Sequence, residues 1–126
     1  MRLNPDCVRD ILMSIEEIST GKDYIIISSE NYKAFDLLEK YEYNIIEYHI
    51  NQCELCGFFF DFSQRLNEVY WIRDLTPKAH EFLANIRDNS IWNKAKSMTK
   101  QVGSSSLNVL VTIATEIVKE KLSGIF

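Results

Sequence analysis

Residues 44–73 have the sequence NIIEYHINQCELCGFFFDFSQRLNEVYWIR, and this stretch decides the fold class. Its first part has apolar side chains at helical spacing and stops at Gly57, a residue type that commonly ends helices. Residues 58–62 and 69–73 are rich in aromatic and β-branched side chains, as is typical of strands. The stretch predicts a helix capped by Asn44 and followed directly by a β-hairpin. The apolar positions of the helix are Ile46, Ile50, Cys53 and Cys56.

The segment before this stretch predicts two helices and one strand. Asn4 is a suitable N-cap for a first helix, with Pro in its first turn and Gly21 as its C′ residue. Residues 24–28 predict a strand, and residues 30–41 predict a short helix. The expected buried positions of the two helices are Val8, Ile11, Leu12, Ile15 and Ile18, and then Ala34, Phe35, Leu37 and Leu38.

The segment after the hairpin predicts two or three helices. Thr76 and Pro77 begin one helix, Asp88 to Ser90 form a kink or a new cap, and Gly103 ends the segment. Ser104 to Ser106 form a turn and a cap for the last helix. The expected buried positions are Ala79, Phe82, Leu83 and Ile86, then Ile91, Trp92, Ala95, Met98 and Val102, and finally Leu107, Leu110, Val111, Ala114, Ile117, Val118 and Leu122.

The predicted fold is therefore mainly α with a small β-hairpin, an α+β protein. The order of elements is that of a winged helix-turn-helix with added C-terminal helices. In such folds the helix before the hairpin can enter a DNA major groove, and the hairpin is the wing. We expect a single compact unit, with a winged-helix domain at 1–88 and a helical extension at 89–126 that packs on it or dimerises.

Several spaced motifs resemble those of a known family. They are Arg9-Asp10-Ile11-Leu12, Tyr48-His49, Leu75-Thr76, His80-Glu81-Phe82-Leu83, Ile86-Arg87-Asp88, Trp92-Asn93-Lys94-Ala95-Lys96, Val102-Gly103 and Ser106-Leu107. Together they resemble the prophage-associated family known as domain of unknown function 2513, over nearly the whole chain. The resemblance implies a winged-helix fold, carriage by bacteria and their phages, and no established activity.

Length and composition limit the function further. The chain has 126 residues, 46% of them hydrophobic, and a formal net charge of -4, which argues against a surface that is basic all round. The first residues have no apolar signal-peptide core, and the longest apolar stretch, residues 107–118, is short and interrupted by polar side chains. We therefore expect a cytoplasmic protein with no membrane partner.

The cysteines and histidines allow one metal-binding hypothesis. His49, Cys53 and Cys56 fall at i, i+4 and i+7 of one helix, and Cys7 or His80 would have to supply a fourth ligand. A single Cys-x-x-Cys at apolar helix positions favours core packing instead, and the pair lies at the wrong helix end for redox chemistry. No catalytic motif is present, so we expect neither an enzyme nor a cofactor.

Nucleic-acid binding is the first functional hypothesis, in the form of a small DNA-associated regulator. Residues 23–64 hold two lysines against eight acidic residues, so the predicted reading helix is acidic. Positive charge gathers instead in residues 87–100, and the wing adds two arginines. A solvated helix face explains the basic segment equally well. The expected DNA contacts are Asn44, Tyr48, Asn51, Arg65, Arg73, Lys94, Lys96 and Lys100.

Protein binding is the second hypothesis. An acidic surface rich in tyrosine suits a basic partner, such as a host regulatory or defence complex that a phage protein engages. The expected contacts are Tyr41, Glu42, Tyr43, Glu47, Tyr48 and Glu54. The last helix also has Val109 and Ile113 outside its core stripe, which predicts either burial within the monomer or a homodimer.

Overall fold

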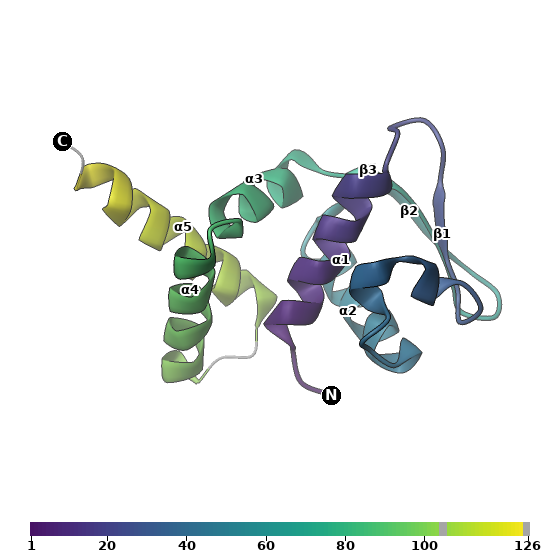
Figure 1. The fold of residues 1–126 in the computed structure, drawn as a ribbon, viewed down its shortest axis with the longest axis horizontal. Helices are drawn as coiled ribbons and strands as arrows, with labels where there is room; N and C mark the ends of the chain where they lie inside the picture. The colour runs from purple at the N-terminus through teal and green to yellow at the C-terminus, as the bar shows by residue number, and fades with distance from the viewer. Residues whose placement is uncertain (104–105, 125–126) are drawn as a thin grey trace.

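The computed structural model describes residues 1–103 and 106–124. This part of the chain forms five α-helices and a three-stranded sheet (Figure 1). The prediction of a mainly helical α+β protein is confirmed. In chain order the elements are α1 (Pro5–Ile18), β1 (Ile25–Ile27), the 3₁₀ turns η1 (Tyr32–Ala34) and η2 (Asp36–Leu38), α2 (Tyr43–Leu55), β2 (Phe59–Arg65), β3 (Val69–Leu75), α3 (Pro77–Ile86), α4 (Asn89–Val102) and α5 (Leu107–Ser123).

The sheet is antiparallel, with the strand order β1-β3-β2. β2 and β3 form the predicted hairpin. β1 pairs with the other edge of β3, where Ile25 lies opposite Ile72. Tyr70 and Ile72 of β3 are buried while Val69, Trp71 and Arg73 are partly exposed, so one face of the central strand points into the core.

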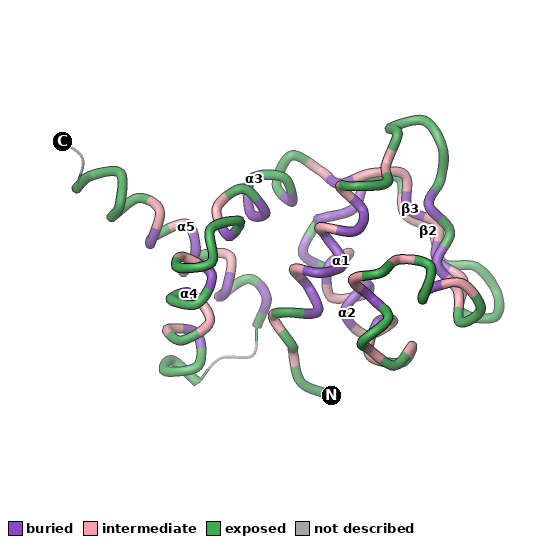
Figure 2. Tube along the Cα trace, viewed as in Figure 1, coloured by how far each residue is buried: buried purple, intermediate pink, exposed green. Residues whose placement is uncertain are grey.

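α1 is the helix around which the rest of the core assembles. It packs against η2, α2, α3 and β3, and in Figure 2 its buried side faces the other elements. Asn4 caps it as predicted, because the Asn4 side chain accepts from the backbone N–H groups of Asp6 and Cys7. The predicted end at Gly21 is wrong. α1 ends at Ile18, and Gly21 adopts φ +78° in the turn that follows.

The predicted helix over residues 30–41 is also wrong. The segment forms η1 and η2, with an extended residue, Phe35, between them. Asn31 gives the physical reason, because its side chain accepts from the backbone N–H of Ser28 and donates to the carbonyl of Ile26, each at 2.8 Å. Such local bonds compete with helix formation. Ala34, expected in the core, is exposed.

α2 has the predicted extent at its C-terminal end but not the predicted cap. Gly57 follows the helix with φ +80°, a conformation that glycine adopts without strain. Asn44 lies inside the first turn, because the chain is extended at Glu42 and helical from Tyr43. The Tyr43 hydroxyl donates to the carbonyl of Glu68 at 2.7 Å, which ties the start of α2 to the hairpin turn.

The three C-terminal helices begin where the sequence predicts. Thr76 caps α3, and Asp88 accepts from the N–H groups of Ser90 and Ile91 to cap α4. The α3 core positions are buried as expected, whereas Val102 of α4 is 67% exposed and Leu122 of α5 is 53% exposed. Ser104 and Ser105 of the predicted turn lie outside the described residues.

Candidate functional site

Two polar side chains of α2 that the sequence assigned to a binding surface face the sheet instead. The Glu47 carboxylate accepts from the Tyr70 hydroxyl at 2.9 Å. The Asn51 amide donates to the backbone carbonyl of Glu47 at 3.0 Å and lies 3.4 Å from the Tyr70 oxygen. Burial and the Glu47 carboxylate raise the pKa of Tyr70 to about 12, so its hydroxyl keeps its proton. These contacts join α2 to β3.

Asn44 and Tyr48 remain the accessible polar groups in the first half of α2. Asn44 is exposed, and Tyr48 is half-buried with its ring in an edge contact with the His49 ring at 4.9 Å between centroids. Further along the helix, Glu54 is half-buried, and this burial raises the pKa of its carboxyl. The accessible surface of α2 is therefore less acidic than its sequence.

The proposed protein-contacting tyrosines also make internal hydrogen bonds. The Tyr41 hydroxyl donates to the Asp10 carboxylate at 2.7 Å, and the Tyr43 hydroxyl donates to the Glu68 carbonyl. Glu42 is exposed at the start of α2. The structure thus leaves Glu42 and the outer part of Tyr48 as the more accessible members of that predicted surface.

His49 has a structural role that occupies both ring nitrogens. Nε2 accepts from the backbone N–H of Asn4 at 2.7 Å, and Nδ1 donates to the Ile45 carbonyl at 2.8 Å. Neither nitrogen is then available as a metal ligand. Cys53 and Cys56 are buried, and burial raises the pKa of both thiols. Across residues 1–103 and 106–124, no group of three Cys, His, Asp or Glu side chains is arranged to hold a metal ion.

The two arginines of the hairpin differ in their surroundings. Arg73 forms an ion pair with Asp61 at 2.8 Å and donates to the Tyr24 hydroxyl at 3.1 Å. Arg65 lies near the hairpin turn, is exposed, and stacks over the Trp71 ring at 4.6 Å. Arg73 is therefore neutralised within the sheet, whereas Arg65 presents its charge to solvent.

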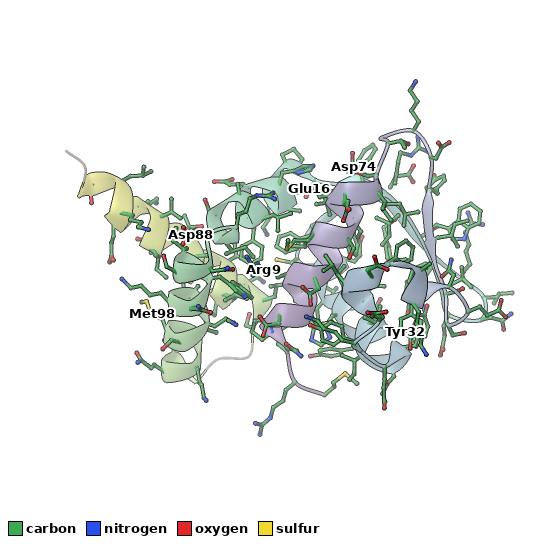
Figure 3. All side chains as sticks on the ribbon, in the orientation of Figure 1. Arg9, Glu16, Tyr32, Asp74, Asp88 and Met98 are labelled. Atoms are coloured by element: carbon green, nitrogen blue, oxygen red, sulfur yellow. The ribbon has the colours of Figure 1, made fainter. Side chains whose placement is uncertain are left out.

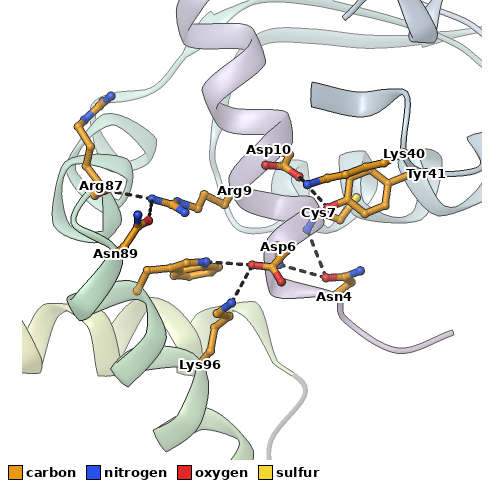
Figure 4. A network of polar contacts seen from close by, with 11 residues as sticks. Asn4, Asp6, Cys7, Arg9, Asp10, Lys40, Tyr41, Arg87, Asn89 and Lys96 are labelled. Atoms are coloured by element: carbon orange, nitrogen blue, oxygen red, sulfur yellow. Dashed lines mark hydrogen bonds and ion pairs between the residues drawn. The ribbon is translucent and has the colours of Figure 1, made fainter. Parts of the chain in front are cut away.

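The basic residues of the 87–100 segment also differ in their surroundings, since two form ion pairs and two are exposed and form no ion pair with another described residue. Arg87 pairs with Glu16 of α1 at 2.9 Å. Figure 3 shows Glu16 near Asp74 of β3. Lys96 pairs with Asp6 at 3.0 Å, and the same Asp6 oxygen accepts from the indole N–H of Trp92 (Figure 4). Lys94 and Lys100 are exposed.

Asp6 is a strongly held carboxylate. Burial acts to raise its pKa, but the hydrogen bonds from Lys96 and Trp92 outweigh burial, so the pKa lies below its ordinary value. Arg9 adds a second link from α1 to the C-terminal helices, because it donates to the Arg87 carbonyl and the Asn89 side chain (Figure 4). α4 is thereby fixed against the first turns of α1.

The elements that carry several of the predicted residues follow one another in one view of the ribbon. In Figure 1 the hairpin turn, α2, the chain N-terminus and the last turn of α4 follow one another from right to left across the lower part of the view. Sequence reasoning missed Arg2, which lines a groove together with Lys96 and Lys100. Nothing in the sequence around Arg2 indicates that α4 packs beside it.

The last helix is covered in part by its neighbours. α5 contacts α3 and α4, and Val109 and Ile113 are half-buried. The outward side of its first half carries Asn108 and Thr112, which are exposed. The contacts within the chain account for part of the apolar surface that predicted a homodimer. None of the described helices is long and apolar enough to cross a membrane.

Comparisons with known proteins assign this chain to a protein family. A family model described as "Hypothetical protein (DUF2513)" matches residues 2–106, and the chain belongs to this family. It is 28% identical over 127 residues to an uncharacterized protein of Haemophilus influenzae (strain KW20 / Rd), a match that covers 98% of this chain and 100% of the relative. No solved structure matches the chain.

Proposed function

We propose that this protein is a bacterial or prophage-encoded winged-helix protein that binds duplex DNA as a regulator and catalyses no reaction. The observation that carries the proposal is the arrangement of α1, β1, α2 and the β2–β3 hairpin, with the strand order β1-β3-β2 and α2 directly before the hairpin. In winged-helix proteins a helix in this place enters the major groove, and the hairpin lies beside it as the wing.

The reading surface is the first half of α2. The Asn44 amide is exposed, and an asparagine side chain matches the hydrogen-bonding edge of adenine in the major groove. Tyr48 lies one turn further along the same helix and offers a hydroxyl for a phosphate or a base edge. The Asn51 amide donates to the Glu47 carbonyl and to the Tyr70 hydroxyl, so it contributes to the position of the helix rather than to base contacts.

The affinity comes from cations on the elements beside α2. Neutralised phosphates supply most non-specific DNA affinity, and α2 has no Lys or Arg. Arg65 on the wing and Lys100 near the end of α4 are exposed. In Figure 1 the hairpin turn and the last turn of α4 lie on either side of α2. Lys94 is a further exposed cation of α4. With few such cations, binding is weak, and its salt dependence is modest because the slope grows with the number of phosphates neutralised.

A second candidate function is binding to a basic protein partner through the acidic start of α2. The exposed Glu42 and the absence of cations from α2 favour it. This alternative predicts that Glu42→Lys weakens the partner complex while Lys100→Gln leaves it unchanged.

Fluorescence anisotropy with mixed duplex fragments at two salt concentrations tests the proposal. We expect a Kd of about micromolar at low salt and clearly weaker binding when the salt concentration rises. Tyr48→Ala and Arg65→Gln should each weaken binding several-fold. Lys119→Gln, an exposed substitution on α5, is the matched control. Absence of binding by the wild-type protein at low salt would contradict the proposal.

A further inference from the structure

A groove of about 630 Å³ lies between the N-terminal segment and α4. Its size is within the range of roughly 300–1,000 Å³ that small-molecule sites occupy. The residues that line it are Arg2, Leu3, Pro5, Lys96, Thr99, Lys100 and Gly103. Three of these side chains are cationic and none is acidic, in a chain whose net charge is -4. The groove therefore differs in charge from the rest of the surface.

The carboxylate beside the groove offsets one of the three cations and leaves the other two. Asp6 accepts from both Lys96 and the Trp92 indole, so its oxygen is turned toward α4 and already satisfied by two donors (Figure 4). Lys96 shares its charge with Asp6, whereas Arg2 and Lys100 are exposed at the groove. An anion that enters the groove meets two cations that are accessible and a third that is fixed in place.

The remaining lining residues favour an anion that carries an uncharged, partly apolar group. Leu3 and Pro5 provide an apolar wall. The Thr99 hydroxyl donates to the Ala95 carbonyl at 2.8 Å, so it does not offer its proton to a ligand. A sugar-phosphate unit has this combination of a charged group and a less polar ring, and a bare inorganic anion does not.

The groove is also fixed relative to α2. The backbone N–H of Asn4, which follows Leu3 in the groove wall, donates to Nε2 of the buried His49 of α2 at 2.7 Å. This bond sets the position of the groove wall beside the helix that is proposed to enter the major groove. The proposed function thus brings a phosphate-bearing strand to the helix beside which the groove wall is fixed.

We propose that this groove binds a phosphodiester of the nucleic-acid backbone, with Arg2 and Lys100 as the phosphate ligands and Lys96 as a fixed cation behind them. The inference rests on the proposed function, because it names the place where the DNA backbone is held. It also assigns a binding role to Arg2, Leu3 and Pro5, which precede or begin α1.

The first test compares two double variants of the full chain. Arg2→Gln/Lys100→Gln removes two cations from the groove, and Lys119→Gln/Lys121→Gln removes two exposed cations from α5. In a duplex titration over several salt concentrations, the groove variant should bind about tenfold or more weakly at moderate salt. Its plot of log K against log salt should be less steep by about two, since each lost phosphate contact lowers the slope by about one. The α5 variant should match the wild type.

The second measurement locates the bound phosphate by amide NMR. Added duplex should shift the Leu3, Lys100 and Gly103 amide signals of the wild type, and these shifts should be absent in the groove variant. Duplex binding with equal slopes for both double variants overturns the groove assignment and leaves the proposed function standing. If the wild type binds no duplex, the proposed function fails. In that case a titration with inorganic pyrophosphate that shifts the groove amides shows a site for small anions, which overturns the phosphodiester assignment.

Discussion

α2 and the edge formed by the N-terminal segment and α4 use their polar side chains in opposite ways. On α2, Glu47 and Asn51 are engaged with Tyr70 and with the helix itself. On the other edge, Lys96 is held by Asp6, but Arg2 and Lys100 are exposed. Under the proposed function α2 is the reading helix, while the accessible charge lies on its neighbours.

Under the proposed function, this difference assigns contacts with DNA bases to α2 and affinity for the DNA backbone to its neighbours. A helix without cations has little attraction for phosphates, and its exposed Asn44 and half-buried Tyr48 suit contacts that depend on sequence. Exposed cations on adjoining elements provide attraction that does not depend on sequence. Substitutions on the two regions should therefore have different effects on specificity and on salt dependence.

The largest expected effect comes from removing the contact that holds α4, with Lys96 and Lys100, against α1. Trp92 is buried, donates to Asp6 and lies between Lys96 and Arg9. Trp92→Ala should lower the free energy of unfolding by roughly 3–5 kcal/mol, because it leaves a cavity and removes one of the two donors to Asp6. Urea unfolding checks this value, and a loss below about 1 kcal/mol would show that α4 is held by other contacts.

His49 gives a pH-dependent test of the link between α2 and the groove wall. Burial lowers its pKa below the ordinary 6.5. In the pH range between 6.5 and the lower folded-state pKa, the unfolded chain binds a proton that the folded chain does not, so stability should fall as the pH falls through this range. His49→Gln should remove this part of the pH dependence, and His80→Gln, at an exposed site, should retain it. The same curve for all three proteins would contradict the internal role of His49.

Tyr70→Phe tests the internal use of the α2 polar groups. It removes the hydroxyl that donates to Glu47 and should lower the free energy of unfolding by about 1 kcal/mol. Thermal or urea unfolding gives the measurement. Because the lost contact lies between α2 and β3, the salt dependence of DNA binding should stay unchanged, and a changed slope would show that Glu47 faces the phosphates.

The smallest expected effect distinguishes the two arginines of the hairpin. Arg65→Gln should weaken duplex binding several-fold, since Arg65 is exposed near the turn. Arg73→Gln should leave duplex binding nearly unchanged, because Arg73 is paired with Asp61. Anisotropy titrations of the two variants at equal salt provide the comparison. Equal losses for both would place the whole outer face of the sheet in the interface.

The sequence predicted those parts of the fold that depend on local chemistry. Asn4, Thr76 and Asp88 cap their helices, because each side chain accepts from N–H groups two or three residues further along. The segment after β1 was wrong because Asn31 forms local bonds that oppose a helix. Asn44 was wrong as a cap because the chain is already helical at Tyr43, which puts the cap position at Glu42.

The candidate site was less predictable than the fold. Helical spacing places Glu47 and Asn51 on a polar side of α2, but their partner Tyr70 comes from a strand distant in sequence. The same limit applies to Lys96 and Asp6, which belong to different ends of the chain. Helical periodicity predicts which side chains are exposed. Hydrogen bonds and ion pairs between side chains of distant elements can be identified only in the packed structure.

The most direct test of the central claim, that α2 faces DNA, is to add a cation to it. Asn44→Lys places a positive charge at an exposed position in the first turn of α2, and Ala84→Lys adds the same charge at an exposed position of α3. We expect Asn44→Lys to bind duplex more tightly, with a salt slope steeper by about one, while Ala84→Lys binds as the wild type does. Equal affinities and equal slopes for the two variants would contradict the account.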